Sequence, residues 1–502
     1  MAIFAKQKHY AKIIAVKDKT KEFFLFRHRF IIGYILIMVI FVALLFILPS
    51  IAPEGLSHDE MNSAVTSDNL HLDFMKQGNV VNLPYYALQK ISIKIFGLTL
   101  YAIKIPSIIF GAFSALFLTL LLNRWFKSDV AIIGSALATL STAFLSLANF
   151  GTPDILYIFW ISLILWLGSK IVGNKNIHPF FVILFTSSIA LSLYTPHLCY
   201  IALAILIAGI AHPHLRYSIK ALKPWQLVLA ILIFAVGVAP LGISVFYHHN
   251  IIQELAFMEN FSQRAYIQNL KNAFAPYFSF TLAYDSVHLA PLFGLATVAL
   301  IAIGFISSLD KLFASRNSVT YMLVAFAVII SGLNVTCAAI IIVPVAIMCS
   351  AAIDSMIMRW KSIFPKNPYA HLIGATPIVI TLAIMLISGL AHYIQGYHYT
   401  PRVTKNFSED LALFTKELKT GDTLILNTED ENHDFYKLFA KKNNINVNYE
   451  FPKNSEGRVA VIEAPVEAKG YELSHISTSS KSRNSDRLYI YTKVTDKQET
   501  GE

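Results

Sequence analysis

The chain alternates between long apolar runs and short polar connections. A helix that crosses the hydrocarbon core of a bilayer needs roughly 20 apolar residues, and about eleven runs approach that length. Their approximate limits are 30–51, 100–122, 130–149, 154–172, 179–195, 197–212, 227–247, 290–309, 319–334, 335–353 and 371–394. The ninth and tenth runs belong to one unbroken stretch, which we divide at Gly332-Leu333-Asn334. The pattern predicts an α-helical polytopic membrane protein with about 11 transmembrane helices.

The composition agrees with a bilayer environment. Hydrophobic residues make up 55% of the 502 residues and charged residues only 14%, whereas soluble domains are usually about 45–50% apolar. The net charge of +10 could suggest nucleic acid. The excess Lys and Arg, however, lies at the N-terminus and between the apolar runs, where it suits anionic lipid and topology. We therefore expect membrane lipids, and no nucleic acid, as partners.

The positions of Lys and Arg predict the orientation, because positively charged flanks tend to stay cytoplasmic. Residues 1–29 are densely basic, and so is every second connection between the apolar runs. This places the basic N-terminus in the cytoplasm and the protein in the cytoplasmic (plasma) membrane. Two long loops, near 52–99 and 248–289, then lie outside together with the chain after about residue 398. Within the first loop, Leu83 to Phe96 suits a helix lying along the membrane surface.

The composition after Tyr399 is that of an ordinary soluble module. Residues 398–495 are predicted to form a small extracytoplasmic α/β domain, with a polar tail over 496–502 and the transmembrane domain over 30–397. The patterns indicate helices at Phe407–Leu418 and near Phe435–Lys442, and strands at Thr423–Leu426 and near Val447, Val459 and Leu488.

Two acidic positions lie where apolar runs meet the predicted outer face. Ser57-His58-Asp59-Glu60 begins the first external loop, and Asp154 lies at the short external turn between the third and fourth runs. Ionisable groups at a membrane boundary are either solvated or functional. A solvated loop start is the plain alternative for Asp59 and Glu60. For Asp154 the alternative is a helix cap or a favourable helix-dipole position.

Other polar groups on the same face are weaker candidates. His197 follows a tight turn that should lie near the level of Asp154. A histidine at a helix end is more often structural than a metal ligand, so no metal ligands are assigned, and a divalent cation is left open. Arg264 and Lys271 in the second long loop could bind phosphate, since arginine suits bidentate phosphate contact. Exposed loop cations are usually just solvated.

Taken together, these residues resemble the integral-membrane GT-C glycosyltransferases, particularly the branch related to protein O-mannosyltransferases and the lipid A aminoarabinose transferase. The resemblance extends over roughly residues 30–395. It is carried by Asp59-Glu60, Asn82-Leu83-Pro84-Tyr85-Tyr86, Ile95-Phe96-Gly97-Leu98, Ala102-Ile103-Lys104-Ile105-Pro106-Ser107, Asn149 to Asp154, and Gln268-Asn269-Leu270-Lys271-Asn272.

The resemblance implies a GT-C type fold and a glycosyltransferase that acts on the outer membrane face. The donor would be a polyprenyl-phosphate-linked sugar, the acceptor a protein, lipid or cell-wall glycan, and the enzyme an inverting hexosyl- or pentosyltransferase. It places the catalytic base on Asp59, with Glu60 beside it, and a second acidic position on Asp154, which would orient the acceptor or help the base. Substrate contacts are expected from His58, Tyr85, His197, Arg264 and Lys271.

The chemistry explains why carboxylates are needed. A polyprenyl phosphate is already a stabilised anionic leaving group, so the enzyme chiefly has to activate an acceptor hydroxyl and hold both reactants in line. Cationic groups or helix N-termini would stabilise the charge that develops on the phosphate.

One departure from the family pattern concerns the donor phosphate. In the family that this chain resembles, many members carry an arginine ahead of a proline in a late span. Residues 334–344 here contain no cation. Arg264, Lys271, His197 or a metal could take its place, or the transferase activity could have been lost. Retention of Asp59, Glu60 and Asp154 favours a substitute.

Two other classes of function are open to a polytopic membrane protein. A transporter or flippase of a lipid-linked substrate would favour ionisable groups deep within the spans and paired broken helices, whereas the acidic residues here gather at the outer boundary. A non-catalytic scaffold would require Asp59 and Asp154 to lie apart, without a shared site.

Overall fold

The computed structural model describes residues 28–494, apart from 72, 173–177, 221, 258–261, 280–288, 311, 364–367, 428–429, 453–456, 463–469 and 480–486. Most of the predicted basic N-terminus, the polar tail and parts of the predicted 248–289 loop therefore lie outside the described residues.

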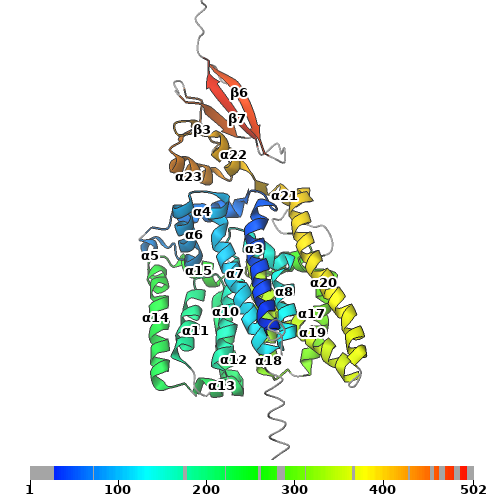
Figure 1. Ribbon diagram of the computed structural model, residues 1–502. Coiled ribbons are helices and arrows are strands. Elements are labelled where there is room, and N and C mark those ends of the chain that lie inside the picture. The colour runs from blue at the N-terminus through cyan, green and yellow to red at the C-terminus, as the bar shows by residue number, and fades with distance from the viewer. Residues whose placement is uncertain are drawn as a thin grey trace, which may run out of the picture.

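A bundle of apolar helices forms the body of the molecule (Figure 1). Each of the predicted runs coincides with one helix or with two consecutive ones. These helices are α3 (Arg29–Ile47), α7 (Leu100–Trp125), α8 (Ser128–Thr139), α9 (Thr142–Asn149), α10 (Ile155–Ile171), α11 (Pro179–Ser192), α12 (Leu198–Ala211), α14 (Pro224–Tyr247), α17 (Leu295–Leu309), α18 (Ser315–Ser331), the 3₁₀ helix η2 (Val335–Ile341), α19 (Ile342–Ile363) and α20 (Pro368–Tyr399).

Five segments of the described chain are long and apolar enough to cross a membrane, and a sixth is obtained if α8 and α9, bent by 58°, form one span. The other apolar helices, α10, α11, α12, α17 and α18, have 14–17 residues. At 1.5 Å per residue they are shorter than a hydrocarbon core of about 30 Å. The protein is thus a multi-pass membrane protein, and the full number of eleven spans stays a prediction.

Burial separates the centre of the bundle from its periphery. In the span formed by η2 and α19, 89% of an 18-residue apolar window is buried inside the protein, whereas in α14 the corresponding share is 6%. Small residues allow the central helices to approach closely: a Cβ atom at Gly304 of α17 would collide with the backbone of Met348 on α19. Because lipid tails are as apolar as leucine, such close packing is a main source of helix association in a bilayer.

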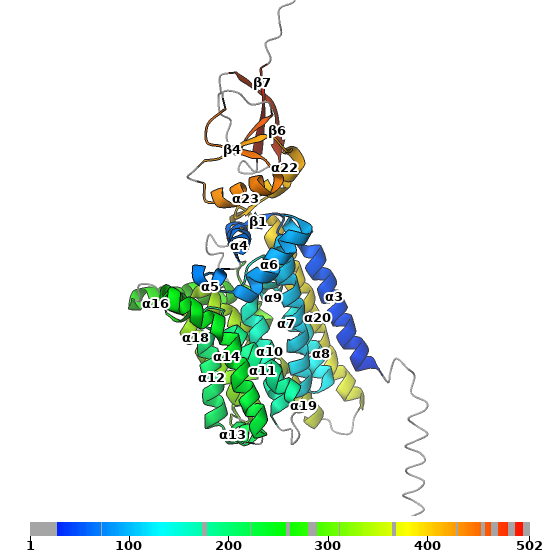
Figure 2. The same cartoon turned by 90° about the vertical axis from the view of Figure 1, so that its left-hand side faces the viewer.

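One end of the bundle carries a layer of polar and amphipathic helices, and we call it the sheet end because the C-terminal sheet lies beyond it (Figures 1 and 2). The opposite end is the far end. The layer and its connections comprise η1 (Leu48–Ser50), β1 (Leu56–Ser57), α4 (His58–Asp68), α5 (Phe74–Gln77), α6 (Leu83–Phe96), α15 (Asn250–Ala256), α16 (Gln263–Phe278) and α21 (Pro401–Thr404). At the far end lies the short helix α13 (Pro213–Lys220).

The C-terminal segment folds around a five-stranded sheet of order β4-β3-β5-β7-β6, in which β3 is parallel to β4 and β5 while β7 is antiparallel to β5 and β6. Its elements are β2 (Phe407–Ser408), α22 (Asp410–Glu417), β3 (Thr423–Ile425), α23 (His433–Asn443), β4 (Asn446–Asn448), β5 (Val459–Ile462), β6 (Tyr471–Thr478) and β7 (Arg487–Lys493). The sequence prediction missed β6. Its side chains are mostly exposed, so it lacks the apolar alternation that marks a half-buried strand.

The sheet segment is joined to the bundle by shared contacts. The two-residue strands β1 and β2 pair antiparallel, with Leu56 opposite Ser408. Met61 of α4 packs in one hydrophobic cluster with Phe414 of α22 and Phe439 of α23. These contacts fix α4, and therefore Asp59, against the bundle and the C-terminal segment.

Candidate functional site

The first acidic pair lies in the first turn of α4, where its two members have opposite surroundings. The Ser57 hydroxyl accepts a hydrogen bond from the Glu60 N–H, and the Glu60 carboxylate accepts one from the Ser57 N–H, which is a capping box. Asp59 is exposed, whereas Glu60 is completely buried. Of the two carboxylates, only that of Asp59 is open to a substrate.

Both oxygens of the Glu60 carboxylate are engaged. Oε2 accepts from the N–H of Ser57 at 2.9 Å, and Oε1 accepts from the N–H of Gly151 at 2.7 Å. The ammonium of Lys104 lies 3.3 Å from Oε1, and both side chains of this ion pair have no exposed surface. Glu60 thereby ties α4 to α7 and to the turn before α10. Lys104 is a further residue of the site that was not predicted, although a lone cation near the start of an apolar run requires a partner.

Asp154 lies in the connection between α9 and α10, outside both helices. Its side chain accepts a hydrogen bond from the Thr152 hydroxyl at 3.3 Å. Within the described structure it makes no capping hydrogen bond to α10, so the cap interpretation gains no support. Burial among neighbouring groups, followed by the negative charge of Asp59, raises the pKa of Asp154 from 3.8 to about 6, and the Thr152 bond opposes this rise. Asp59 and Asp154 are therefore close enough to interact electrostatically.

A buried hydrogen-bond network holds this connection in place. Tyr85 is fully buried, and its hydroxyl lies 2.8 Å from the Ser107 hydroxyl, which donates to the carbonyl of Thr152 at 3.2 Å. Gln89, also fully buried, donates to the carbonyls of Ile103 and Gly151. Tyr85, which was expected to contact substrate, thus lies beneath the site and supports its backbone.

The two candidate histidines, His58 and His197, have different surroundings. In His58, Nδ1 lies 2.9 Å from Oδ1 of Asn432 and Nε2 lies 2.7 Å from Nδ2 of Asn62. The first contact joins α4 to the C-terminal segment and the second lies within α4, so both ring nitrogens are occupied. His197 is 2% exposed, and its backbone N–H donates to the carbonyl of Leu255 on α15. Burial lowers the pKa of His197, which favours a neutral ring.

The candidate cations lie on α16. Arg264 and Lys271 are both exposed. Near the other end of this helix, Tyr277 is buried, and its pKa is raised by burial and by the charge of Asp154. Arg264 precedes Tyr277 by 13 residues, roughly 20 Å along a helix, and Lys271 by about half that distance. The structure brings the end of α16 to the site, with Lys271 nearer than Arg264.

The late segment that lacks an arginine lies beside the start of α10. Oδ1 of Asn334 caps η2 by accepting from the N–H and the hydroxyl of Thr336. The Thr336 hydroxyl is 3.3 Å from the hydroxyl of Tyr157, and the Cys337 thiol is 3.7 Å from that same hydroxyl. Uncharged polar groups of this segment therefore contact Tyr157, which follows Asp154 by less than one helical turn. Among the described residues, no three His, Cys, Asp or Glu side chains are grouped to hold a metal ion.

Comparison with known proteins places this arrangement in a structural class. Residues 83–241 match the model of a family described as dolichyl-phosphate-mannose-protein mannosyltransferase. No curated protein sequence matches the chain. The fold is similar to ArnT from Cupriavidus metallidurans bound to undecaprenyl phosphate, with a TM-score of 0.51 and 11% identity over 90% of this chain and 97% of that chain.

A second similar structure is the oligosaccharyltransferase of Archaeoglobus fulgidus tethered with an acceptor peptide, with a TM-score of 0.51 and 12% identity over 85% of this chain and 64% of that chain. At such identities the likeness establishes the fold, and activity has to be argued from the site. The chain has the fold of the GT-C integral-membrane glycosyltransferases, which confirms the resemblance predicted from its sequence.

Proposed function

We propose that the protein transfers a sugar from a polyprenyl-phosphate carrier to a protein, lipid or cell-wall acceptor at the outer face of the cytoplasmic membrane. The observation that carries the proposal is the pair of carboxylates at the sheet end. Asp59 is exposed, and its charge contributes to the raised pKa of Asp154. Two carboxylates with different surroundings can take different roles in one reaction. The likeness to a GT-C structure that binds undecaprenyl phosphate supports this choice of donor.

In the proposed reaction Asp59 accepts the proton of the acceptor hydroxyl as that oxygen attacks the anomeric carbon and the bond to the carrier phosphate breaks. Attack from the face opposite the phosphate inverts the anomeric configuration. Asp154 orients the acceptor. Glu60 positions Asp59, because its carboxylate is fully occupied by Ser57, Gly151 and Lys104. General base catalysis by a positioned carboxylate contributes typically about 10²–10⁴-fold to a rate.

The phosphate of the sugar carrier requires hydrogen-bond donors, preferably cationic ones. The late segment, residues 334–344, contains no cation. Lys271 is our first candidate, because it lies nearer than Arg264 to the end of α16 that reaches Asp154. The proposal routes no step through a divalent cation, and adding a chelator to the transfer assay tests whether one is needed.

The orientation rests on charge. The far end carries Arg124 in the last turn of α7, Lys127 just after that helix, and Arg216 and Lys220 on α13. Because basic connections tend to stay cytoplasmic, we propose that the sheet end faces outside. Reaction of single engineered cysteines at positions 70 and 217 with an impermeant thiol reagent in intact cells tests this orientation. Labelling at 70 and protection at 217 are expected.

Purified protein in lipid nanodiscs tests the function directly. It would be supplied with radiolabelled polyprenyl-phosphate sugars and with panels of peptide, lipid and glycan acceptors. Transfer of label to one acceptor class is expected. A labelled donor that merely crosses the bilayer of a proteoliposome, with no acceptor modified, would contradict the proposal and favour a flippase.

A further inference from the structure

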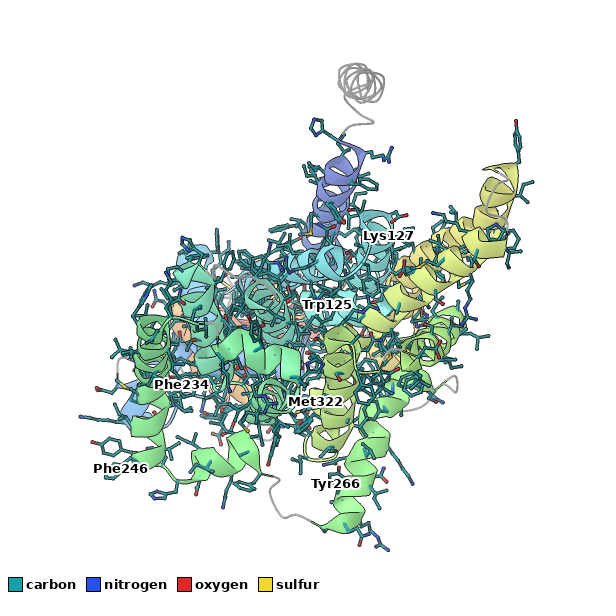
Figure 3. The ribbon with its side chains drawn as sticks, turned by 90° about the horizontal axis from the view of Figure 1, so that it is seen from below. Trp125, Lys127, Phe234, Phe246, Tyr266 and Met322 are labelled. Carbon is teal, nitrogen blue, oxygen red and sulfur yellow. The ribbon has the colours of Figure 1, made fainter. Side chains whose placement is uncertain are left out.

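A second concave feature lies away from the acidic site. A cavity of about 970 Å³ is enclosed by α10, α11, α12, α13, α14 and α18, with the end of α7 at its rim. Figure 3, seen from the far end, labels three of its lining residues: Trp125 of α7, Phe234 of α14 and Met322 of α18. The volume lies near the upper end of the range of about 300–1,000 Å³ for ligand pockets.

The cavity is located in the far-end half of the bundle. Along α10, which begins beside Asp154, the lining starts only at Ile164 and continues to Val172, roughly 15 Å further along the helix axis. Along α18 it covers the first turns, from Ser315 to Leu323, while the end of that helix leads to η2 and the acidic site. The cavity is therefore separate from the carboxylate pair.

The walls suit a hydrocarbon chain. Most lining side chains are aliphatic or aromatic, and several of them remain accessible in the folded protein: Leu203, Leu206 and Ile210 of α12 are 46%, 59% and 61% exposed. Apolar side chains that line the cavity and stay this accessible are consistent with an opening toward the surrounding hydrocarbon. An acyl chain can enter from that side without crossing a polar barrier.

Two arginines lie at the far end of the cavity, and the carboxylate of Asp354 is near enough to Arg316 to interact with it electrostatically. Arg124 and Arg316 both belong to its lining. Nε of Arg124 donates to the carbonyl of Ser169, while Arg316 donates from Nε to Asn317 and from Nη1 to the carbonyl of Trp125 and lies 4.5 Å over the ring of Phe126. A guanidinium has five N–H donors, so these described bonds orient the two groups and leave further donors on each.

Hydrocarbon walls that end in two arginines match one class of molecule. We propose that this cavity binds an anionic glycerophospholipid from the leaflet at the far end, with its acyl chains between α10, α12 and α18 and its phosphate at Arg124 and Arg316. That leaflet is the cytoplasmic one in the proposed orientation. Arginine binds phosphate in a bidentate manner. When the acyl chains lie in the cavity, an anionic headgroup is next to Arg124 and Arg316.

The geometry distinguishes this lipid from the sugar donor. A donor engaged at Asp154 has its phosphate at the sheet end, so only the end of a prenyl tail could reach Arg124 and Arg316, where an uncharged hydrocarbon gains nothing from two cations. A phospholipid of the far-end leaflet has its phosphate and its chains in the required order along the bundle axis.

The test measures lipid binding rather than transfer, so its outcome is independent of the proposed function. Full-length protein is delipidated in detergent and titrated with phosphatidylglycerol, phosphatidylcholine, undecaprenyl phosphate or inorganic phosphate alone. Bound lipid is counted by native mass spectrometry, and the thermal unfolding midpoint is recorded in parallel. Retention of one phosphatidylglycerol, about tenfold tighter than phosphatidylcholine, is expected, which corresponds to ~1.4 kcal/mol.

Two variants test the two halves of the site. Arg124→Gln removes one cation and should lower phosphatidylglycerol affinity about tenfold. It should lower phosphatidylcholine affinity less, because the choline cation already offsets the charge of that lipid's phosphate. Ala202→Phe fills the cavity with a ring and should weaken both lipids. Lys127→Gln, beside the rim but outside the lining, and Ala211→Phe, at the exposed end of α12, are the matched controls and should bind as the unaltered protein does.

Four results would overturn the proposal. The first two are equal retention of phosphatidylglycerol and phosphatidylcholine, and unchanged binding in both Arg124→Gln and Ala202→Phe. The third is preferential binding of undecaprenyl phosphate that Ala202→Phe abolishes, which would assign the cavity to the donor. The fourth is that inorganic phosphate alone raises the unfolding midpoint as much as phosphatidylglycerol does. The cavity would then contain an anion site that does not require a lipid.

Discussion

Charged side chains at the two ends of α7 and α10 have opposite surroundings. At the sheet end, Lys104 of α7 is fully buried and is neutralised by Glu60, while Asp154 precedes α10 and is surrounded by hydrogen-bonded backbone. At the far end, Arg124 of α7 is exposed at the rim of an apolar cavity, into which the last turns of α10 point. The same two helices thus support a fixed polar site at one end and an adaptable hydrocarbon site at the other.

The difference follows from what each end has to hold. A group that accepts a proton must be placed within hydrogen-bond reach of its substrate, which requires the buried network of Glu60, Gln89, Tyr85 and Ser107 below it. A lipid chain needs only volume and apolar walls, and the contact of its phosphate with Arg124 and Arg316 sets its direction. Substitutions at the sheet end should therefore have large effects, and those at the far end small ones.

The largest expected effect is on transfer rate in Asp59→Asn. Removing the proposed base should lower the rate by about 10²–10⁴-fold, measured with labelled donor in nanodiscs. The control is Asp73→Asn, an exposed acid of the same loop, which should keep the original rate. A rate within threefold of the unaltered protein in Asp59→Asn, with normal unfolding, would remove Asp59 from the base role.

Breaking the buried ion pair should destabilise the protein strongly. Lys104→Met leaves the Glu60 carboxylate buried without its cation, and removing one partner of a buried pair typically costs about 3–5 kcal/mol. Denaturant titration in mixed micelles measures it. The double variant Lys104→Met with Glu60→Gln should recover part of the loss, because no charge remains but Gln has only one acceptor oxygen for the N–H groups of Ser57 and Gly151. Lys94→Met, at an exposed position of α6, should be neutral. Equal losses in the single and double variants would show that the pair itself contributes little.

The pH dependence of stability is the next test. Because the pKa of Asp154 rises from 3.8 to about 6 on folding, the folded state holds this proton more tightly. The associated stability is fully present below about pH 3.8 and is lost as the pH rises through about 6. Asp154→Asn should remove this decline, so its thermal midpoint should exceed that of the unaltered protein above pH 6 and approach it near pH 4. A constant difference from pH 4 to 7 would contradict the raised pKa.

The smallest expected effect concerns the contact between α4 and α23. Lys442 lies 2.7 Å from Asp68, and both side chains are roughly one-quarter to one-third exposed. Partly exposed ion pairs are worth about 0–1 kcal/mol, so Lys442→Ala should lower the unfolding midpoint slightly and leave transfer within twofold. Lys441→Ala, an exposed neighbour, should change neither. A large loss of transfer in Lys442→Ala alone would mean that docking of the C-terminal segment controls Asp59.

Much of the architecture could be predicted from the sequence because hydrophobic length and the position of cations are local properties of the chain. The apolar runs, the break at Gly332-Leu333-Asn334, the surface helix Leu83–Phe96 and strands β3, β5 and β7 all correspond to described elements. Asp59 and Asp154 were selected because polar residues at the ends of apolar runs are conspicuous.

The tertiary structure alone decided which of those polar residues are exposed and which are buried and paired. Asp59 and Glu60 are neighbours in sequence, yet one is exposed and the other is fully buried against Lys104 and Gly151. Tyr85 and His58 are held by Ser107 and Asn432, partners 22 and 374 residues away. Burial and hydrogen bonding depend on which helices meet in space. Local sequence therefore indicates where charge lies along the chain, and only the packed bundle determines which charge is paired and which is free to react.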